Sequence, residues 1–167
     1  MSYFIGIVII IISYILEITL LQSIALAGVI PNLLLIVVIS FAYLRGRRHG
    51  MIFGMAAGLL FDLANGSLLG INAFAFMLLG YLAGYFHRIY TKEDYTLIYC
   101  MIAAADFLYS LYYYAIEFML RYRLALREYM RLVCLPELVY TVLTAIPVYL
   151  LLSHVNDGIV RMEYKEE

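Results

Sequence analysis

Charged residues are scarce in this sequence, and their scarcity excludes a soluble globular domain. Only 14% of the 167 residues are charged and 66% are hydrophobic, whereas an ordinary soluble domain is about a quarter charged. Eleven Lys and Arg with twelve Asp and Glu cannot cover the surface of a soluble protein of this size. The mean hydropathy of +0.94 predicts an integral membrane protein, and the net charge of −1 gives no reason to expect a nucleic-acid partner.

Residues and motifs that carry chemistry are also few. Cys100 and Cys134 have no ligand-like spacing to a histidine, and their apolar surroundings are typical of structural thiols. The sequence contains no HExxH, P-loop or dinucleotide-binding motif, and its three histidines have no triad-like acidic partner. We therefore expect no catalytic residues, no cofactor and no metal site. A spanning helix takes about 20 residues, so a fused ATPase or kinase domain has no room.

The apolar runs predict an all-α integral membrane fold, a bundle of about six transmembrane helices. Turn-forming and basic segments separate the runs, among them Pro31-Asn32, Arg45–Arg48 and Asn65-Gly66-Ser67. No Lys or Arg precedes Arg45, so the first run is expected to be a retained helix and not a signal peptide. The expected helices span residues 3–23, 31–44, 50–63, 71–87, 95–120 and 134–153 of a single membrane domain (1–153), followed by a polar cytoplasmic tail (154–167).

The distribution of Lys and Arg predicts the orientation of the chain. If the amino terminus is inside, seven of these residues lie on the inner side and four on the outer side, which favours two cytoplasmic termini. The inner set is Arg45, Arg47, Arg48, Arg88, Lys92, Arg161 and Lys165, and the outer set is Arg121, Arg123, Arg127 and Arg131. The outer arginines suit an amphipathic helix at the headgroup level, and their role stays open.

The densest local pattern is a row of small residues that ends in an acid. Gly50, Gly54, Gly58 and Asp62 recur every four residues, which places them on one helix face within an arc of about 120°. The glycines make this face flat, so another helix can approach closely, either from the same chain or from a partner protein. Asp62 either holds the turn to the next helix or contacts a ligand or partner directly.

Other acids lie in apolar segments. Asp106 is in the middle of the expected helix 95–120, where a buried hydrogen bond to a tyrosine competes with a role in proton relay. Glu137 follows Pro136 and suits the first turn of a helix, where a negative charge is favourable. Glu17 stands alone in the first helix.

The stretch from residue 54 to residue 70 resembles the signature of the bacterial rod shape-determining protein MreD family. That family shows a GxxxGLLxD-type helix end, a short turn and then LG at the start of the next helix. Residues 54–62 (GMAAGLLFD) and 69–70 (LG) are similar to it. Further similar segments are Pro31-Asn32-Leu33, Gly80-Tyr81-Leu82, Leu135-Pro136 and Ile146-Pro147-Val148-Tyr149. The resemblance covers nearly the whole chain, except for the arginine-rich segment 121–131.

The resemblance implies a non-catalytic scaffold of the rod-shape, or cell-elongation, peptidoglycan synthesis complex in the bacterial inner membrane. The partners that it implies are MreC, the polymerase RodA with its transpeptidase partner, and MreB, beside the lipid bilayer. It also implies a fold similar to the S components of energy-coupling-factor transporters. Carried over by position, the important residues are Gly54, Gly58, Asp62 and Gly70, and with Gly50 they are our candidates for partner binding or packing.

That fold similarity supplies an alternative hypothesis, the substrate-binding S component of a vitamin transporter. Such a component holds a small molecule near the outer face and typically docks on its energising module through small residues of its first helix. Here residues 5–21 contain a single glycine, Gly6, and carry bulky Ile, Leu and Tyr on nearly every face. The sequence therefore favours the scaffold. A membrane enzyme acting on lipids is a third hypothesis, for which no acid–base pair is visible.

Overall fold

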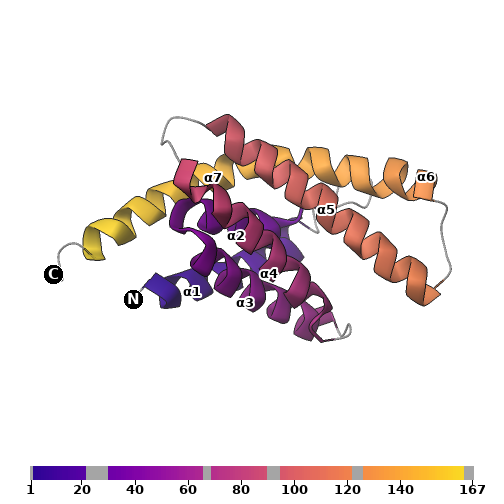
Figure 1. Cartoon of the computed structure of the whole chain (residues 1–167), viewed down its shortest axis with the longest axis horizontal. Helices are drawn as coiled ribbons and strands as arrows, with labels where there is room; N and C mark the ends of the chain where they lie inside the picture. The colour runs from indigo at the N-terminus through magenta and orange to yellow at the C-terminus, as the bar shows by residue number, and fades with distance from the viewer. Residues whose placement is uncertain (1, 22–29, 66–68, 90–94, 122–125, 164–167) are drawn as a thin grey trace.

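The structure is a computed structural model that describes residues 2–21, 30–65, 69–89, 95–121 and 126–163 (Figure 1). Within these ranges the chain is almost entirely helical and contains no strand, so the all-α prediction is confirmed. The elements are α1 (Ser2–Leu16) with a π-helical turn (Glu17–Leu21), α2 (Leu33–Arg45), α3 (Arg47–Asn65), α4 (Ile71–Ala83) with a 3₁₀ turn (Gly84–Ile89), α5 (Tyr95–Arg121), α6 (Leu126–Tyr129), a second π-helical turn (Met130–Cys134) and α7 (Leu135–Glu163).

Among the residues that the structure describes, two helical runs are long and apolar enough to cross a bilayer by length and composition, Tyr95–Ile116 and Leu126–Gly158. The shorter apolar helices of the described chain are Phe4–Thr19, Leu33–Arg45 and Ile71–His87. Many large apolar side chains of α1, α4 and α7 are exposed. An apolar surface of this kind suits a lipid environment better than water.

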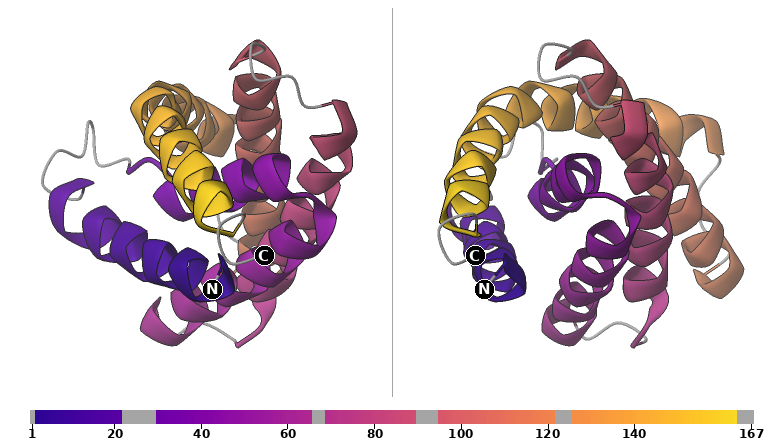
Figure 2. Two further views of the ribbon diagram at one scale, coloured as in Figure 1. Left: turned by 90° about the vertical axis from the view of Figure 1, so that its left-hand side faces the viewer. Right: turned by 60° about the vertical axis from the view of Figure 1, so that its left-hand side comes forward.

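α2 is the buried centre of the fold. Every residue from Leu33 to Leu44 is buried, and Figure 2 shows α2 enclosed by α1, α3 and α7. Its 13 residues give it a length of about 20 Å, less than the roughly 30 Å of a bilayer core. A helix that is apolar all round is stable when protein surrounds it. Its N-terminus therefore lies inside the fold, where its N–H groups need partners from the chain.

Basic residues gather at one end of the molecule. Arg45, at the end of α2, donates from Nε to Asn156 Oδ1 of α7 at 2.6 Å. His87, in the 3₁₀ turn after α4, has Nδ1 2.7 Å from the Tyr43 carbonyl oxygen. Arg47 opens α3 directly after this point. The α2–α3 turn, the end of α4 and the late part of α7 thus lie together, and the end of α3 and the start of α4 lie at the opposite end.

The last helical run differs from the expected helix 134–153. It begins at Leu126 and passes through α6 and the π-helical turn into α7. Pro136 does not break this run; it lies directly after the π-helical turn, where the hydrogen-bond pattern of the helix already changes. Arg127 and Arg131 are exposed on this run, whereas Arg123 lies outside the described residues.

The helix end predicted near residue 153 also differs from the structure. Residues 154–163 continue α7 as a helix, because no proline after Pro147 interrupts it. Both Figure 1 and Figure 2 place the first turns of α1 on the same side of the molecule as the last turns of α7.

Candidate functional site

The glycine face of α3 packs directly against α4. A Cβ atom at Gly50 would overlap the carbonyl oxygen of Gly80, and one at Gly54 would overlap that of Phe76. At Gly58 the obstacle is the backbone of Ala73. The three glycines lie one helical turn apart on α3, and each faces the backbone of a successive turn of α4. The two helices are therefore in backbone contact over most of their length. The second helix that the flat face predicted is supplied, in this structure, by the chain itself.

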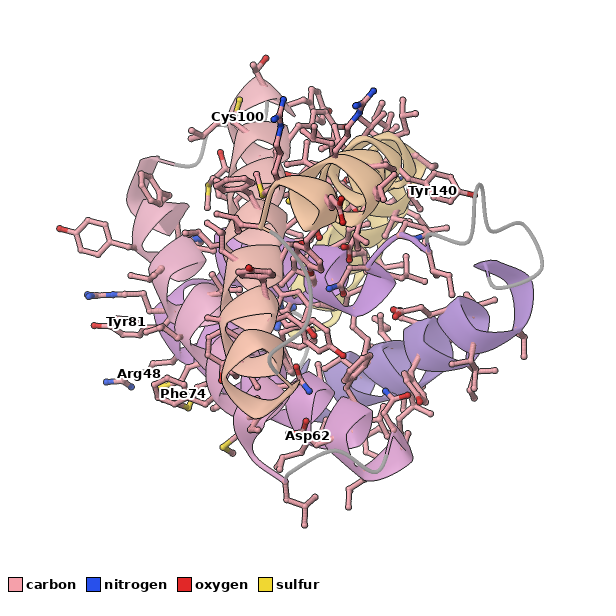
Figure 3. All side chains as sticks on the ribbon, turned by 90° about the vertical axis from the view of Figure 1, so that its right-hand side faces the viewer. Arg48, Asp62, Phe74, Tyr81, Cys100 and Tyr140 are labelled. Atoms are coloured by element: carbon pink, nitrogen blue, oxygen red, sulfur yellow. The ribbon has the colours of Figure 1, made fainter. Side chains whose placement is uncertain are left out.

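Asp62, at the end of this face, holds the N-terminus of α4. Its Oδ2 accepts hydrogen bonds from the backbone N–H groups of Gly70 at 2.9 Å and Ala73 at 3.2 Å. Its Oδ1 accepts from the side chain and backbone nitrogens of Asn72 at 2.7 and 3.3 Å. Asp62 is 0% exposed, and Figure 3 shows it between the helices while Phe74 and Tyr81 point outward.

The geometry around Asp62 explains why the chain has an acid at position 62 and a glycine at position 70. The first N–H groups of a helix have no intrahelical partner, and a carboxylate both accepts from them and is stabilised by the helix dipole. Gly70 precedes α4 in a left-handed conformation, with φ +101°. A side chain at position 70 would meet no atom within 4 Å. Glycine is therefore favoured by the left-handed backbone conformation and not by a lack of space.

Two tyrosines of α5 extend this network. Tyr109 donates from its hydroxyl to Asn72 Oδ1 at 2.9 Å, and Tyr112 donates to the Ile71 carbonyl oxygen at 2.8 Å. Asn72 thus bridges Asp62 and Tyr109, and all three side chains are buried. Sequence analysis missed Asn72 and Tyr109; an amide at the start of the apolar run 71–87 was the available signal.

A second polar region surrounds the N-terminus of α2. Asn32 caps this helix, accepting with Oδ1 from the Leu35 N–H at 3.0 Å. Glu17, which the sequence left alone in the first helix, accepts with Oε2 from the Leu34 N–H at 3.0 Å. The buried helix start thus obtains acceptors from its own cap and from α1's π-helical turn. This is the same device as at α4, with a carboxylate from another helix.

Asp106 and Glu137 lie in the same region, on α5 and α7. Ser110 donates to Glu137 Oε2 at 3.3 Å, and Glu137 is in the first turn of α7, as predicted. Asp106 is hydrogen-bonded to Thr141 and not to a tyrosine, which corrects the expectation from sequence. Glu137 interacts electrostatically with both Asp106 and Glu17. Three acids from distant parts of the chain therefore meet between α1, α5 and α7.

A cavity of about 380 Å³ opens beside these acids. Its lining combines two carboxylates, four aromatic rings and a few polar and apolar side chains. The lining residues are Glu17, Ile30, Asn32, Phe61, Tyr109, Ser110, Tyr113, Tyr129, Val133 and Glu137. A concave site with a few convergent polar groups is the usual form of a small-ligand pocket.

A second hollow, of about 270 Å³, lies between α4 and α5 and is almost entirely apolar. Small side chains line part of it, including Ala83, Ala104 and Cys100. Cys100 is exposed, whereas Cys134 is buried. A groove with small residues on an apolar surface lets another helix, or a lipid chain, approach closely.

The described residues hold no group of three or more His, Cys, Asp or Glu side chains placed to bind a metal ion. Asp62 and its neighbours use their oxygens on backbone and side-chain N–H groups, and so provide a rigid joint between helices. Near the cavity at the α2 N-terminus, by contrast, Asp106 Oδ1 accepts no hydrogen bond in the described structure.

Comparison with known proteins identifies the family. The sequence model described as rod shape-determining protein MreD matches residues 1–155. No curated protein and no solved structure matches the chain significantly. The match includes the glycine face, Asp62 and Gly70, and all of the acids around the cavity. On this basis the chain belongs to the MreD family of rod shape-determining membrane proteins.

Proposed function

We propose that this protein is a non-catalytic, multi-pass scaffold of the rod-shape peptidoglycan synthesis complex in the bacterial inner membrane. In this role it binds MreC and links it to RodA, to RodA's transpeptidase partner and to MreB. The observation that carries the proposal is the family match over residues 1–155. The exposed apolar side chains of α1, α4 and α7 support it, since they suit a surface covered by lipid and partner helices.

The proposed orientation places both termini in the cytoplasm. Arg45, Arg47 and Arg48 lie at the end of the molecule where α2 meets the late part of α7. Positively charged residues are retained on the cytoplasmic side of a membrane. The cavity at the N-terminus of α2 then faces the outer half of the bilayer.

Gly50, Gly54, Gly58, Asp62 and Gly70 act, in this proposal, by building the α3–α4 pair. Their contacts are with α4 backbone, and Asp62 is fully covered. A partner helix cannot use a face that α4 already occupies. These residues therefore matter for the shape that the scaffold presents, and a partner contacts the protein elsewhere.

The apolar groove between α4 and α5 is the proposed seat of the spanning helix of MreC. Its lining is almost entirely apolar, and the small side chains of Ala83, Cys100 and Ala104 leave room for a helix backbone. Two exposed leucines, Leu82 and Leu108, flank these small residues. They can fill the spaces between side chains of an apolar partner helix.

Cysteine cross-linking in native membranes tests this seat. The exposed Cys100 is a natural probe, because the other cysteine, Cys134, is buried. Cysteines placed along the MreC helix should form disulfides with Cys100 at positions one helical turn apart. The matched control carries Cys100→Ser and Leu150→Cys, which moves the exposed thiol to α7. Equal cross-linking from Leu150→Cys, or none from Cys100, would place the partner elsewhere.

The role itself is tested by identifying what stays attached to the protein. Tagged protein is cross-linked mildly in native membranes, purified and analysed by mass spectrometry. Recovery of MreC with peptidoglycan synthases is the expected result. Recovery of paired ATPases with a membrane coupling subunit would overturn the scaffold and favour the transport alternative.

A further inference from the structure

Three acids at or near the cavity, of which Glu17 and Glu137 line it, have no cationic partner among the described residues. Among the residues that the structure describes, Glu17, Asp106 and Glu137 form no ion pair with Lys, Arg or His. They also interact unfavourably with one another, since Glu137 faces both other carboxylates. An ionisable side chain within a membrane domain is costly unless it is paired, and it marks a functional site more often than not.

Asp106 provides a second, independent observation. It is 1% exposed, yet its Oδ1 has no hydrogen-bond partner in the described structure. Asp106 precedes Tyr109 and Ser110 on α5 by three and four residues, so it shares their face of the helix. Both of those residues line the cavity, whereas Asp106 itself is not one of its lining residues. A buried carboxylate oxygen without a donor normally costs stability, and so it calls for one.

The rings of Tyr109, Tyr113 and Tyr129 determine what kind of donor suits the cavity. All three line it together with Glu17 and Glu137. A tyrosine ring attracts cations over its face, and aromatic groups beside carboxylates are a recurrent way to hold an ammonium group. A dehydrated metal ion would need several oxygen ligands at short range. The described acids are not placed for that.

We propose that this cavity binds a ligand through a compact ammonium group, held between Glu17, Glu137 and the three tyrosine rings. The ammonium group supplies the positive charge that the described lining of the cavity lacks. A volume of about 380 Å³ accommodates an ethanolamine or choline group with space for a substituent. The group comes either from a free amine or from the headgroup of an ethanolamine phospholipid. This proposal is independent of which proteins the scaffold binds.

Thermal unfolding of the purified full-length protein, in detergent without amines, tests the chemistry. The probes are choline, ethanolamine and 3,3-dimethylbutan-1-ol, which has the shape of choline without its charge. We expect saturable stabilisation by at least one of the two amines and none by the neutral analogue. Glu17→Gln and Glu137→Gln, which keep an acceptor oxygen, should weaken binding about tenfold or more, as loss of a buried charge pair does.

Matched variants separate binding from folding. Glu128→Gln changes an exposed acid of α6 outside the cavity and should bind as the parent protein does. Tyr113→Leu removes a ring that is 38% exposed, so folding should tolerate it, and ammonium binding should fall. Equal stabilisation by choline and its neutral analogue would overturn the proposal. So would unchanged binding in Glu17→Gln, Glu137→Gln and Tyr113→Leu.

The source of the ammonium group is distinguished in nanodiscs. If it is a lipid headgroup, protein from discs containing phosphatidylethanolamine retains that lipid in native mass spectrometry, and Glu137→Gln loses it. If it is a free amine, choline or ethanolamine binds equally well in discs made of phosphatidylglycerol alone. Both results support an ammonium site. No saturable binding of either amine and no retained ethanolamine lipid would show that the acids serve the fold only.

Discussion

Two acidic regions lie at the same end of this molecule and use their carboxylates in opposite ways. Asp62 accepts hydrogen bonds from Gly70, Asn72 and Ala73 at the start of α4 and is completely covered. Asp106 is almost as deeply buried but has one carboxylate oxygen without any donor. The comparison separates a carboxylate whose hydrogen bonds complete the fold from one that the fold leaves without a donor at one oxygen.

The difference comes from what each acid faces. Asp62 faces the first N–H groups of a helix, which carry partial positive charge and need acceptors. Glu17 does the same for α2 with one oxygen. Asp106 and Glu137, by contrast, face hydroxyl groups and each other. A hydroxyl supplies one donor and no net charge, so these contacts bring no positive charge to the second region.

The largest effect should come from Gly54→Leu, which should disrupt the packing of α3 against α4 and with it the region around Asp62. The new side chain would occupy the space of the Phe76 backbone. Backbone cannot yield as a flexible side chain does, so α3 and α4 would separate, at a cost comparable with the roughly 5–15 kcal/mol that stabilises a domain. Folded protein in membranes, measured by size-exclusion chromatography with fluorescent detection, should be lost.

A pair of alanine variants controls for this change. Gly54→Ala should lower the unfolding temperature clearly, whereas Gly158→Ala, in α7 with no atom within 4 Å of a new Cβ, should leave it nearly unchanged. If Gly54→Leu accumulates and supports rod shape like the parent protein, α3 and α4 are not held by backbone contact.

Asp62→Ala should have the next largest effect. It leaves the N–H groups of Gly70, Asn72 and Ala73 without this acceptor. Each buried donor left unsatisfied costs about 1–3 kcal/mol, so the loss should be about 3 kcal/mol or more. Chemical unfolding in mixed micelles measures it. A loss below about 1 kcal/mol would mean that water replaces the carboxylate and that the site is open.

The smallest effect concerns Tyr109, which belongs to both regions. Its hydroxyl donates to Asn72 beside Asp62, while its ring lines the cavity. Tyr109→Phe should cost about 1 kcal/mol of stability, the usual value of one hydrogen bond, and should leave ammonium binding intact because the ring remains. Thermal unfolding with and without choline measures both effects. Reduced choline binding with unchanged stability would mean that the Tyr109 hydroxyl serves the cavity and not the fold.

The first region was largely predictable from the sequence, because its pattern is local. Gly50, Gly54 and Gly58 repeat every four residues along one helix, and Asp62 and Gly70 follow within the next twelve residues. What the pattern could not decide was whether the facing helix belonged to this chain. That depended on α4 presenting backbone at Ala73, Phe76 and Gly80 in register with the three glycines.

The second region could not be predicted, because its members are far apart in the sequence. Glu17, Asp106 and Glu137 come from three helices, and no spacing rule connects them. Only the central position of the short helix α2 brings these helices around one point. The extent of the last helix was likewise hidden, since Pro136 suggests a helix start when it actually lies inside a longer helical run.

The central claim is tested most directly by comparing Asp62→Asn with Asp106→Asn in amine-free detergent. Both substitutions keep the shape and one acceptor oxygen while removing a negative charge. Thermal unfolding should show Asp62→Asn destabilised by about 2 kcal/mol, since an amide hydrogen replaces an acceptor of buried N–H groups. Asp106→Asn should be neutral or stabilised by up to about 1 kcal/mol, because repulsion between acids is relieved. Equal destabilisation of both variants would contradict the account.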